Sequence, residues 1–325
     1  MAHERSPLRL VPEPAAGPVG REAPAVLGAV ELVPGRVRAA VVARSGGVLD
    51  RAEAVFDAAS RLPGEVDAAL ARAARVFAGH RLSGVGVAAA GVVDPAAGRI
   101  VEVNDAPSLR GYPVSERLEA LTGAPVRVEH RARVQVLGDR WFGPGRGRRS
   151  FASVSTGEVL GVGILYGGEV LAPDGGRSGA HMTVSASGEV CTCGRRGCWK
   201  TLATTRWLRR RAAELGLDGL DGRADPLAAL VACEDERAAR VVARYAENLV
   251  LGLATVQQLF ACGLFVLHGE AREGGESFRA LVESRLRADV LGGGELPRVM
   301  VSEAAVDDVA LLGGAGLVLS RGQRG

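Results

Sequence analysis

Hydrophobic and polar residues follow two successive patterns of similar order along this chain. In the first, alternating and β-rich segments predict three strands, at residues 27–33, 37–42 and 46–54, joined by glycine turns. Residues 63–79 then have helical spacing, and a run that looks buried predicts a strand at 84–94. The first pattern closes with a loop to residues 99–103, a short amphipathic helix at 114–122 and a strand at 125–129.

The second pattern repeats the order of three strands followed by helix and strand. Its predicted elements are strands at 151–155, 161–166 and 169–171, helices near 199–215, 226–235 and 236–261, strands at 264–268 and 298–302, and a helix at 306–319. Two such units predict an α/β protein of two lobes with a cleft between them.

The expected division of the chain follows from these two patterns. We expect an N-terminal lobe at 26–133 and a C-terminal lobe at 134–325, with the helix at 306–319 packing back toward the N-terminal lobe. Residues 1–25 contain five of the 15 prolines and show no apolar periodicity, which predicts a disordered tail.

Composition narrows the class of protein without identifying it. The chain has 325 residues, of which 47% are hydrophobic and 24% charged, as in ordinary globular proteins. A net charge of +3 is too small to indicate nucleic acid binding. No apolar run is long enough for a membrane span, and the N-terminus lacks the pattern of a signal peptide. We therefore expect a cytoplasmic protein.

A histidine and three cysteines form the most specific motif of the chain. His181, Cys191, Cys193 and Cys198 supply the four ligands that a tetrahedral structural zinc ion prefers, and nearby glycines allow the tight turns that the loop 181–198 needs. Since protein ligands would fill all four positions, none is left for an activated water, which argues against zinc hydrolase chemistry. A chance cluster of buried thiols and a redox pair of cysteines are the alternatives.

This motif and several others resemble the ROK family, which contains bacterial sugar kinases and sugar-responsive repressors. GAHMTV and CTCGRRGC resemble the zinc loop of the family, and DAPSLRGYPVSERLEALTGAPVRVE, LGDRWFGPGRGRRSFASVSTG and LFVLHGEAREGG are similar to its other characteristic segments. The resemblance covers roughly residues 26–320. It implies the two-lobed, actin-like (ribonuclease H-like) ATPase fold and a homo-oligomer.

The resemblance also implies two glycine-rich phosphate loops, and both depart from the family pattern. The matching positions are Glu31 and Gly35 in the first loop and Gly157, Gly161 and Gly163 in the second. Pro34 removes an amide donor from the first loop, and Glu158 would repel a γ-phosphate in the second. We interpret these glycines as ordinary strand turns, and nucleotide binding is the alternative. ATP and Mg²⁺ are therefore not expected as ligands.

The catalytic base of the family's kinases is also replaced. Arg131 stands where the resemblance places the Asp that accepts the hydroxyl proton, and a guanidinium cannot act as a base. His130 lies one position away, where a structural role is expected. Asp105, in the segment that resembles the sugar side, is the one substitute base that the sequence offers.

The sugar contacts implied by the resemblance differ as well. Ser108 replaces an Asn, Ser178 a Glu and Lys200 a second Glu, while His181 is retained. With Arg131 and Arg133 nearby, this set would suit a sugar-derived anion better than a neutral hexose. Loss of the site is the alternative.

We predict a ROK protein without kinase activity, similar to the regulator branch, that senses a sugar or sugar phosphate and acts through a partner or as an oligomer. Because only the proline-rich tail precedes the first lobe, no helix-turn-helix and no direct DNA binding are expected. One alternative is an ATP-dependent, glucokinase-like sugar kinase with a substitute base. The other is an interaction protein that binds no ligand.

Overall fold

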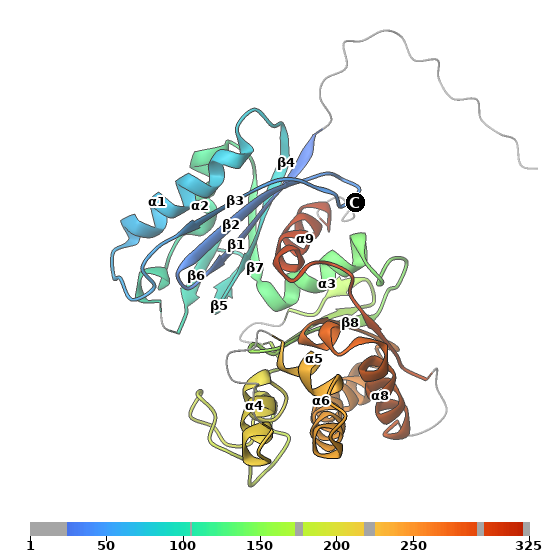
Figure 1. The fold of residues 1–325 in the computed structure, drawn as a ribbon. Coiled ribbons are helices and arrows are strands. Elements are labelled where there is room, and N and C mark those ends of the chain that lie inside the picture. Colours follow the sequence, from blue (N-terminus) through green and yellow to red (C-terminus); the bar gives the residue numbers. More distant parts are fainter. Residues whose placement is uncertain (1–24, 105, 173–177, 218–224, 291–295, 321–325) are drawn as a thin grey trace, which may run out of the picture.

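Two five-stranded sheets of corresponding topology form the two halves of the protein (Figure 1). The computed structural model describes residues 25–104, 106–172, 178–217, 225–290 and 296–320. The predicted tail at 1–25 and the candidate base Asp105 thus lie outside the described residues, except for Ala25.

The first sheet has the strand order β3-β2-β1-β4-β7. Its strands are β1 (Val26–Val33), β2 (Arg36–Val42), β3 (Val48–Val55), β4 (Leu82–Ala89) and β7 (Val126–His130). The strands β1, β4 and β7 are parallel, and β2 and β3 extend the sheet as antiparallel strands. The interior of β1 is buried at every position because helices cover both faces of the sheet.

The second sheet has the order β10-β9-β8-β11-β12. Its strands are β8 (Phe151–Thr156), β9 (Gly161–Tyr166), β10 (Glu169–Val170), β11 (Leu264–Gly269) and β12 (Arg298–Val301). As in the first sheet, the central strand and the two that follow it, β8, β11 and β12, are parallel, while β9 and β10 are antiparallel. A small third sheet pairs β5 (Val92–Asp94) with β6 (Arg99–Glu102).

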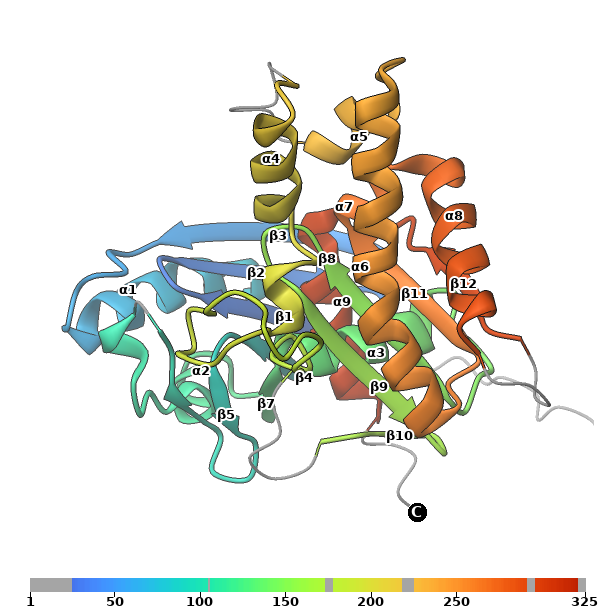
Figure 2. The ribbon, with the colours of Figure 1, turned by 90° about the horizontal axis from the view of Figure 1, so that it is seen from below.

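Separate sets of helices cover the outer faces of the two large sheets (Figures 1 and 2). The first sheet carries α1 (Pro63–Ala74) and α2 (Val114–Thr122). The second half carries α4 (Thr205–Glu214), α5 (Pro226–Val231), α6 (Glu236–Phe260), α7 (Glu270–Glu273) and α8 (Gly275–Ala288).

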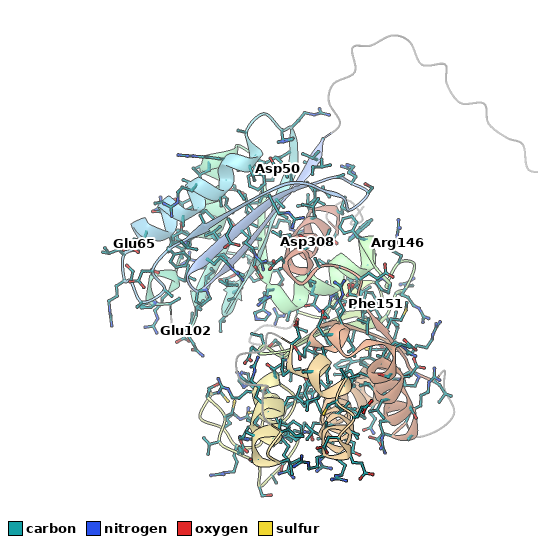
Figure 3. The ribbon with its side chains drawn as sticks, viewed as in Figure 1. Asp50, Glu65, Glu102, Arg146, Phe151 and Asp308 are labelled. Atoms are coloured by element: carbon teal, nitrogen blue, oxygen red, sulfur yellow. The ribbon has the colours of Figure 1, made fainter. Side chains whose placement is uncertain are left out.

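Two helices lie between the sheets and join the halves. Helix α3 (Arg131–Phe142) packs against β8 and β9 of the second sheet, and α9 (Val306–Leu319) packs against α3 and against β1 and β4 of the first. Glycines bring these elements close together: a Cβ on Gly314 would lie 2.5 Å from the carbonyl oxygen of Gly86. Figure 3 shows Asp308, on α9, at this junction.

The α/β class and the two successive units are confirmed, while several elements differ from the prediction. The single strand expected at 84–94 is divided into β4 and β5 at Gly91, whose φ is +85°. The helix expected near 199–215 is a 3₁₀ turn at Trp199–Thr201 followed by α4. Helices α3 and α8 were not predicted. The expected domain boundary at residue 133 falls inside α3, and the division into domains stays a prediction.

Candidate functional site

A cavity of about 540 Å³ opens where the parallel strands of both sheets end. Residues after β1, β4 and β7 line one side, and residues at the ends of β8 and β11 line the other. Ligands of open α/β sheets bind outside the carboxyl ends of the strands, so this cavity is the candidate ligand site. Its lining includes Pro34, His130, Arg131, Gln135, Glu158, Gly161, Ser178 and His268.

A cluster of charges holds Arg131 in the wall of the cavity. Nη2 of Arg131 lies 3.1 Å from Oε1 of Glu31, whose side chain is only 1% exposed. Arg38, the cross-strand neighbour of Glu31, donates to the other oxygen of Glu31 from Nε (2.8 Å) and from Nη2, and also pairs with Asp307 of α9. Both oxygens of the buried carboxylate thus face a guanidinium, which compensates for the cost of burying its charge.

His130 caps α3 instead of acting as a base. Its Nδ1 accepts a hydrogen bond from the backbone N–H of Ala132 (3.2 Å). Burial, together with the charges of Arg133 and Arg131, lowers the pKa of His130 to about 4. The neutral ring therefore carries its proton on Nε2 at pH 7, where it can donate a hydrogen bond but cannot accept a substrate proton.

Glu158 lies in the cavity wall, but its charge is engaged. Arg209 of α4 forms a close ion pair with its carboxylate. Burial alone would raise the pKa of Glu158, but hydrogen bonds and the charges of Arg209 and Arg206 outweigh it and lower the pKa. Because the guanidinium of Arg209 lies beside this carboxylate, Glu158 repels a phosphate less strongly than we predicted from the sequence.

A buried polar network between α3 and the second sheet was missed by the sequence analysis. Asp139 accepts from Ser153 and lies 2.7 Å from Nε2 of His268, and Gln135 accepts from Ser155. Within the described part of the chain, Nε2 of Gln135 and Nδ1 of His268 have no hydrogen-bond partner. No sequence motif marks these residues, because they lie on elements far apart in the chain.

The other predicted ligand residues lie away from the lining of the cavity. Arg133 is buried, pairs with Glu129 at 3.3 Å and does not line the cavity. Ser108 is buried in the 3₁₀ turn Pro107–Leu109, which contacts α1 and β6, and Lys200 belongs to the turn that follows the cysteine loop. The glycines of the predicted phosphate loops that do not line the cavity are Gly35, Gly157 and Gly163. That these glycines belong to degenerate loops and are ordinary strand turns stays a prediction.

His181, Cys191, Cys193 and Cys198 converge on one point and could hold a metal ion. Their ligand atoms all lie within 4.8 Å of one another. Nδ1 of His181 is 3.5 Å from Sγ of Cys191, and Sγ of Cys193 is 3.6 Å from Sγ of Cys198. A tetrahedral zinc site with Zn–S of about 2.3 Å and Zn–N of about 2.0 Å has edges of about 3.5–3.8 Å. The donor set and the two measured edges therefore fit zinc.

The backbone around this cluster explains why its ligands converge. Gly194 and Gly197 have φ values of +81° and +69°, and a Cβ on Gly197 would lie 1.6 Å from the carbonyl oxygen of Ser185. Trp199 follows the last cysteine and is fully buried, with its Nε1 donating to the carbonyl of Asn248 on α6 (2.8 Å). The loop is thus anchored to the helices of the second half.

In the described parts of the chain, no helix is both long and apolar enough to cross a membrane.

Comparison with known proteins identifies relatives over most of the chain. The model of the ROK family matches residues 29–321. The glucokinase of Streptomyces coelicolor is 29% identical over an alignment of 302 residues that covers 86% of this chain and 93% of the relative. The ROK family glucokinase of Streptomyces griseus, solved with glucose and AMPPNP, has a TM-score of 0.73 at 25% identity, covering 90% of this chain and 98% of the other. A ROK transcriptional regulator, a homologue of the Escherichia coli MLC protein, has a TM-score of 0.78 at 20% identity, covering 90% of this chain and 77% of the other. At this identity the likeness shows the fold alone.

These findings confirm the predicted actin-like α/β fold and correct the predicted function. The prediction of a non-kinase sensor is wrong, because relatives that match 86% of this chain in sequence are glucokinases and a solved ROK glucokinase covers 90% of it at 25% identity. The kinase alternative is the better supported one. The expected lack of direct DNA binding and the cytoplasmic location stay predictions.

Proposed function

This chain belongs to the ROK family, and we propose that it is an ATP-dependent kinase that phosphorylates a hydroxyl group of glucose or a related hexose. The observation that carries the proposal is the cavity, since one continuous space is bounded by residues of both halves. Such a space can bring a sugar and a phosphoryl donor into contact in a fixed orientation. The kinase relatives, which extend over 86% of this chain, support it.

In the proposed reaction, the sugar hydroxyl oxygen bonds to the γ-phosphorus of ATP, the bond from that phosphorus to ADP breaks, and the hydroxyl proton passes to the carboxylate of Asp105 or to water. Arg131 and His130 cannot take this proton, and Glu158 is paired with Arg209. Asp105, our predicted substitute base, lies outside the described residues.

The absence of a well-placed base slows such a reaction without abolishing it. General base catalysis contributes about 10²–10⁴-fold, whereas phosphoryl transfer depends mostly on positioning and on stabilising charge. We therefore expect turnover that is slow if Asp105 does not accept the proton.

We also propose that the ion held by the cysteine and histidine cluster is a structural zinc. The cluster does not line the cavity, but its loop begins three residues after Ser178, which does. The carbonyl of Ser178 accepts from the backbone N–H of Val162 on β9 (2.7 Å), so the loop is joined to the wall of the cavity. Zinc would keep this wall in place.

An assay of ADP release tests the kinase proposal, with glucose, mannose and N-acetylated hexosamines as acceptors. We expect ADP release that depends on a sugar, and a phosphorylated sugar detected by mass spectrometry. Asp105→Asn should lower the rate about 10²–10⁴-fold, while Asp50→Asn, exposed on β3, should not change it. Zinc-loaded protein that releases no ADP with any hexose would contradict the proposal. Light scattering would test the homo-oligomer, which stays a proposal.

A further inference from the structure

Gln135 presents an unused donor to the cavity. It is 4% exposed and lines the cavity from α3. Its Oε1 accepts the hydroxyl of Ser155, which fixes the orientation of the amide. Its Nε2 has no hydrogen-bond partner among the described residues, although a buried amide nitrogen without a partner is unfavourable. The site therefore favours a ligand atom that accepts a hydrogen bond.

Arg131 presents a fixed cation to the same cavity, four residues earlier on the same helix. Its side chain is 35% exposed, and the one interaction that it forms within the described regions is the ion pair with Glu31. Oε1 of Glu31 has no well-aligned hydrogen bond, so most of the five N–H groups of the guanidinium remain available. Arg38 holds Glu31 from the other side, which keeps the guanidinium of Arg131 at the wall of the cavity.

Arg131 is the one arginine or lysine of the described lining, and Glu31, its ion-pair partner, is shared with Arg38. His130 is neutral because its pKa is about 4, and Glu158 is paired with Arg209. The N-terminal end of α3, a helix of 12 residues, faces the cavity and adds the positive end of the helix dipole. A negatively charged group that only accepts hydrogen bonds fits the amide donor of Gln135, the guanidinium of Arg131 and the N-terminal end of α3.

We propose that Arg131 and Gln135 form a phosphate-binding subsite at the N-terminal end of α3. The ligand is a phosphate monoester or the terminal phosphate of a phosphoryl donor, and Glu31 and Arg38 act as positioning residues. The subsite rests on the proposed function, because the phosphoryl group would be that of the donor or of the sugar phosphate product. Since a guanidinium supplies the positive charge, binding of phosphate does not require Mg²⁺.

Calorimetric titration of the full, zinc-loaded chain in magnesium-free buffer tests the subsite. The probes are inorganic phosphate, glucose 6-phosphate, AMPPNP and glucose. Arg131→Gln should weaken binding of the phosphates about 10- to 100-fold, and Arg131→Lys should weaken it less, since the charge remains. Gln135→Leu should weaken it about 3- to 10-fold. Arg44→Gln removes the same charge from an exposed position outside the cavity and should have no effect.

The glucose titration separates the subsite from a purely structural role. If Arg131→Gln loses the phosphates but binds glucose with the affinity of the wild type, the subsite is supported. Tighter binding of glucose 6-phosphate than of AMPPNP would assign it to the product, and the reverse order would assign it to the donor. Equal phosphate affinity in Arg131→Gln and wild type, no phosphate binding by the wild type, or joint loss of glucose and phosphate binding would overturn it.

The proposed function and the subsite can fail separately. Sugar-dependent ADP release without phosphate binding in magnesium-free buffer would overturn the subsite and leave the kinase. Phosphate binding that Arg131→Gln removes, in a protein that phosphorylates no sugar, would overturn the kinase and leave the subsite.

Discussion

Glu270 is a buried carboxyl whose charge should lower the stability of the second half of the protein. It lies at the start of α7 and is 7% exposed, and its Oε1 accepts from the backbone N–H of Leu227 at 2.6 Å. Burial raises the pKa of Glu270 from 4.5 to about 7, and the negative charge of Asp225 adds to the rise. The hydrogen bond from Leu227 acts in the opposite direction.

The raised pKa makes stability depend on pH in a defined window. The folded chain binds the proton of Glu270 more tightly than the unfolded chain does. Stability that is present below pH 4.5 is therefore lost as the pH rises through about 7. A shift of this size corresponds to about 3 kcal/mol, since each pKa unit is about 1.4 kcal/mol. Glu270→Gln keeps the shape and the acceptor for Leu227 but cannot ionise. It should be more stable than the wild type by about 2–3 kcal/mol at pH 8 and nearly equal to it at pH 4.5.

Calorimetric melting of both proteins at pH 5 and pH 8 measures this difference. At pH 8 the variant should melt several degrees higher, and at pH 5 the gap should nearly close. Protonation of the cysteine and histidine ligands at low pH affects the stability of both proteins equally, so it cancels in the difference between them. Glu53→Gln, exposed on β3, is the control and should melt with the wild type at both values. A gap of equal size at pH 5 and pH 8 would refute the reasoning.

Three further predictions concern the metal loop, the helix junction and the cap of α3. Elemental analysis should find about one zinc per chain, and Cys198→Ser or chelation should lower the melting temperature; metal-free protein of equal stability would contradict this. Gly314→Ala should destabilise the protein by about 1–3 kcal/mol in thermal melts, because its Cβ would meet the carbonyl of Gly86, while Gly64→Ala, with nothing within 4 Å, should not. In NMR spectra the ring of His130 should stay neutral from pH 8 down to about 5.5, since its pKa is about 4, and a transition near 6.5 would contradict its burial.

The metal cluster and the succession of strands along the chain could be predicted from the sequence because both depend on local patterns. The four metal ligands lie within 181–198, so their spacing alone brings them together. Helix α3 was missed for the opposite reason. Two positions on its buried side are Gln135 and Asp139, whose partners come from β8 and β11, so the helix lacks a simple apolar stripe. Helix α8 does carry one, at Phe278, Val282 and Leu286, and pattern analysis could have found it.

The predicted ligand pocket shows what residue spacing cannot determine. Arg131, Arg133 and Lys200 together indicated a cationic pocket, yet only Arg131 lines the cavity. Arg133 donates to Glu129 on β7, the strand that precedes its helix, and does not line the cavity. The sequence predicted that Glu158 would repel phosphate. In the structure its carboxylate pairs with Arg209, some fifty residues later on α4. The direction and the partner of a charged side chain depend on contacts that are distant in the sequence.

In the proposed kinase, an arginine at residue 131, where the family resemblance implies a catalytic carboxylate, has two opposite effects on phosphoryl transfer. Losing a general base costs about 10²–10⁴-fold in rate. A guanidinium that contacts the transferred phosphoryl group can instead be worth about 10³–10⁵-fold, as arginine fingers of GTPases show. Because these magnitudes overlap, the identity of residue 131 alone does not decide between kinase and non-kinase. Its position does. The pair with buried Glu31 holds the guanidinium at the cavity wall, where it can stabilise charge on phosphate throughout the reaction.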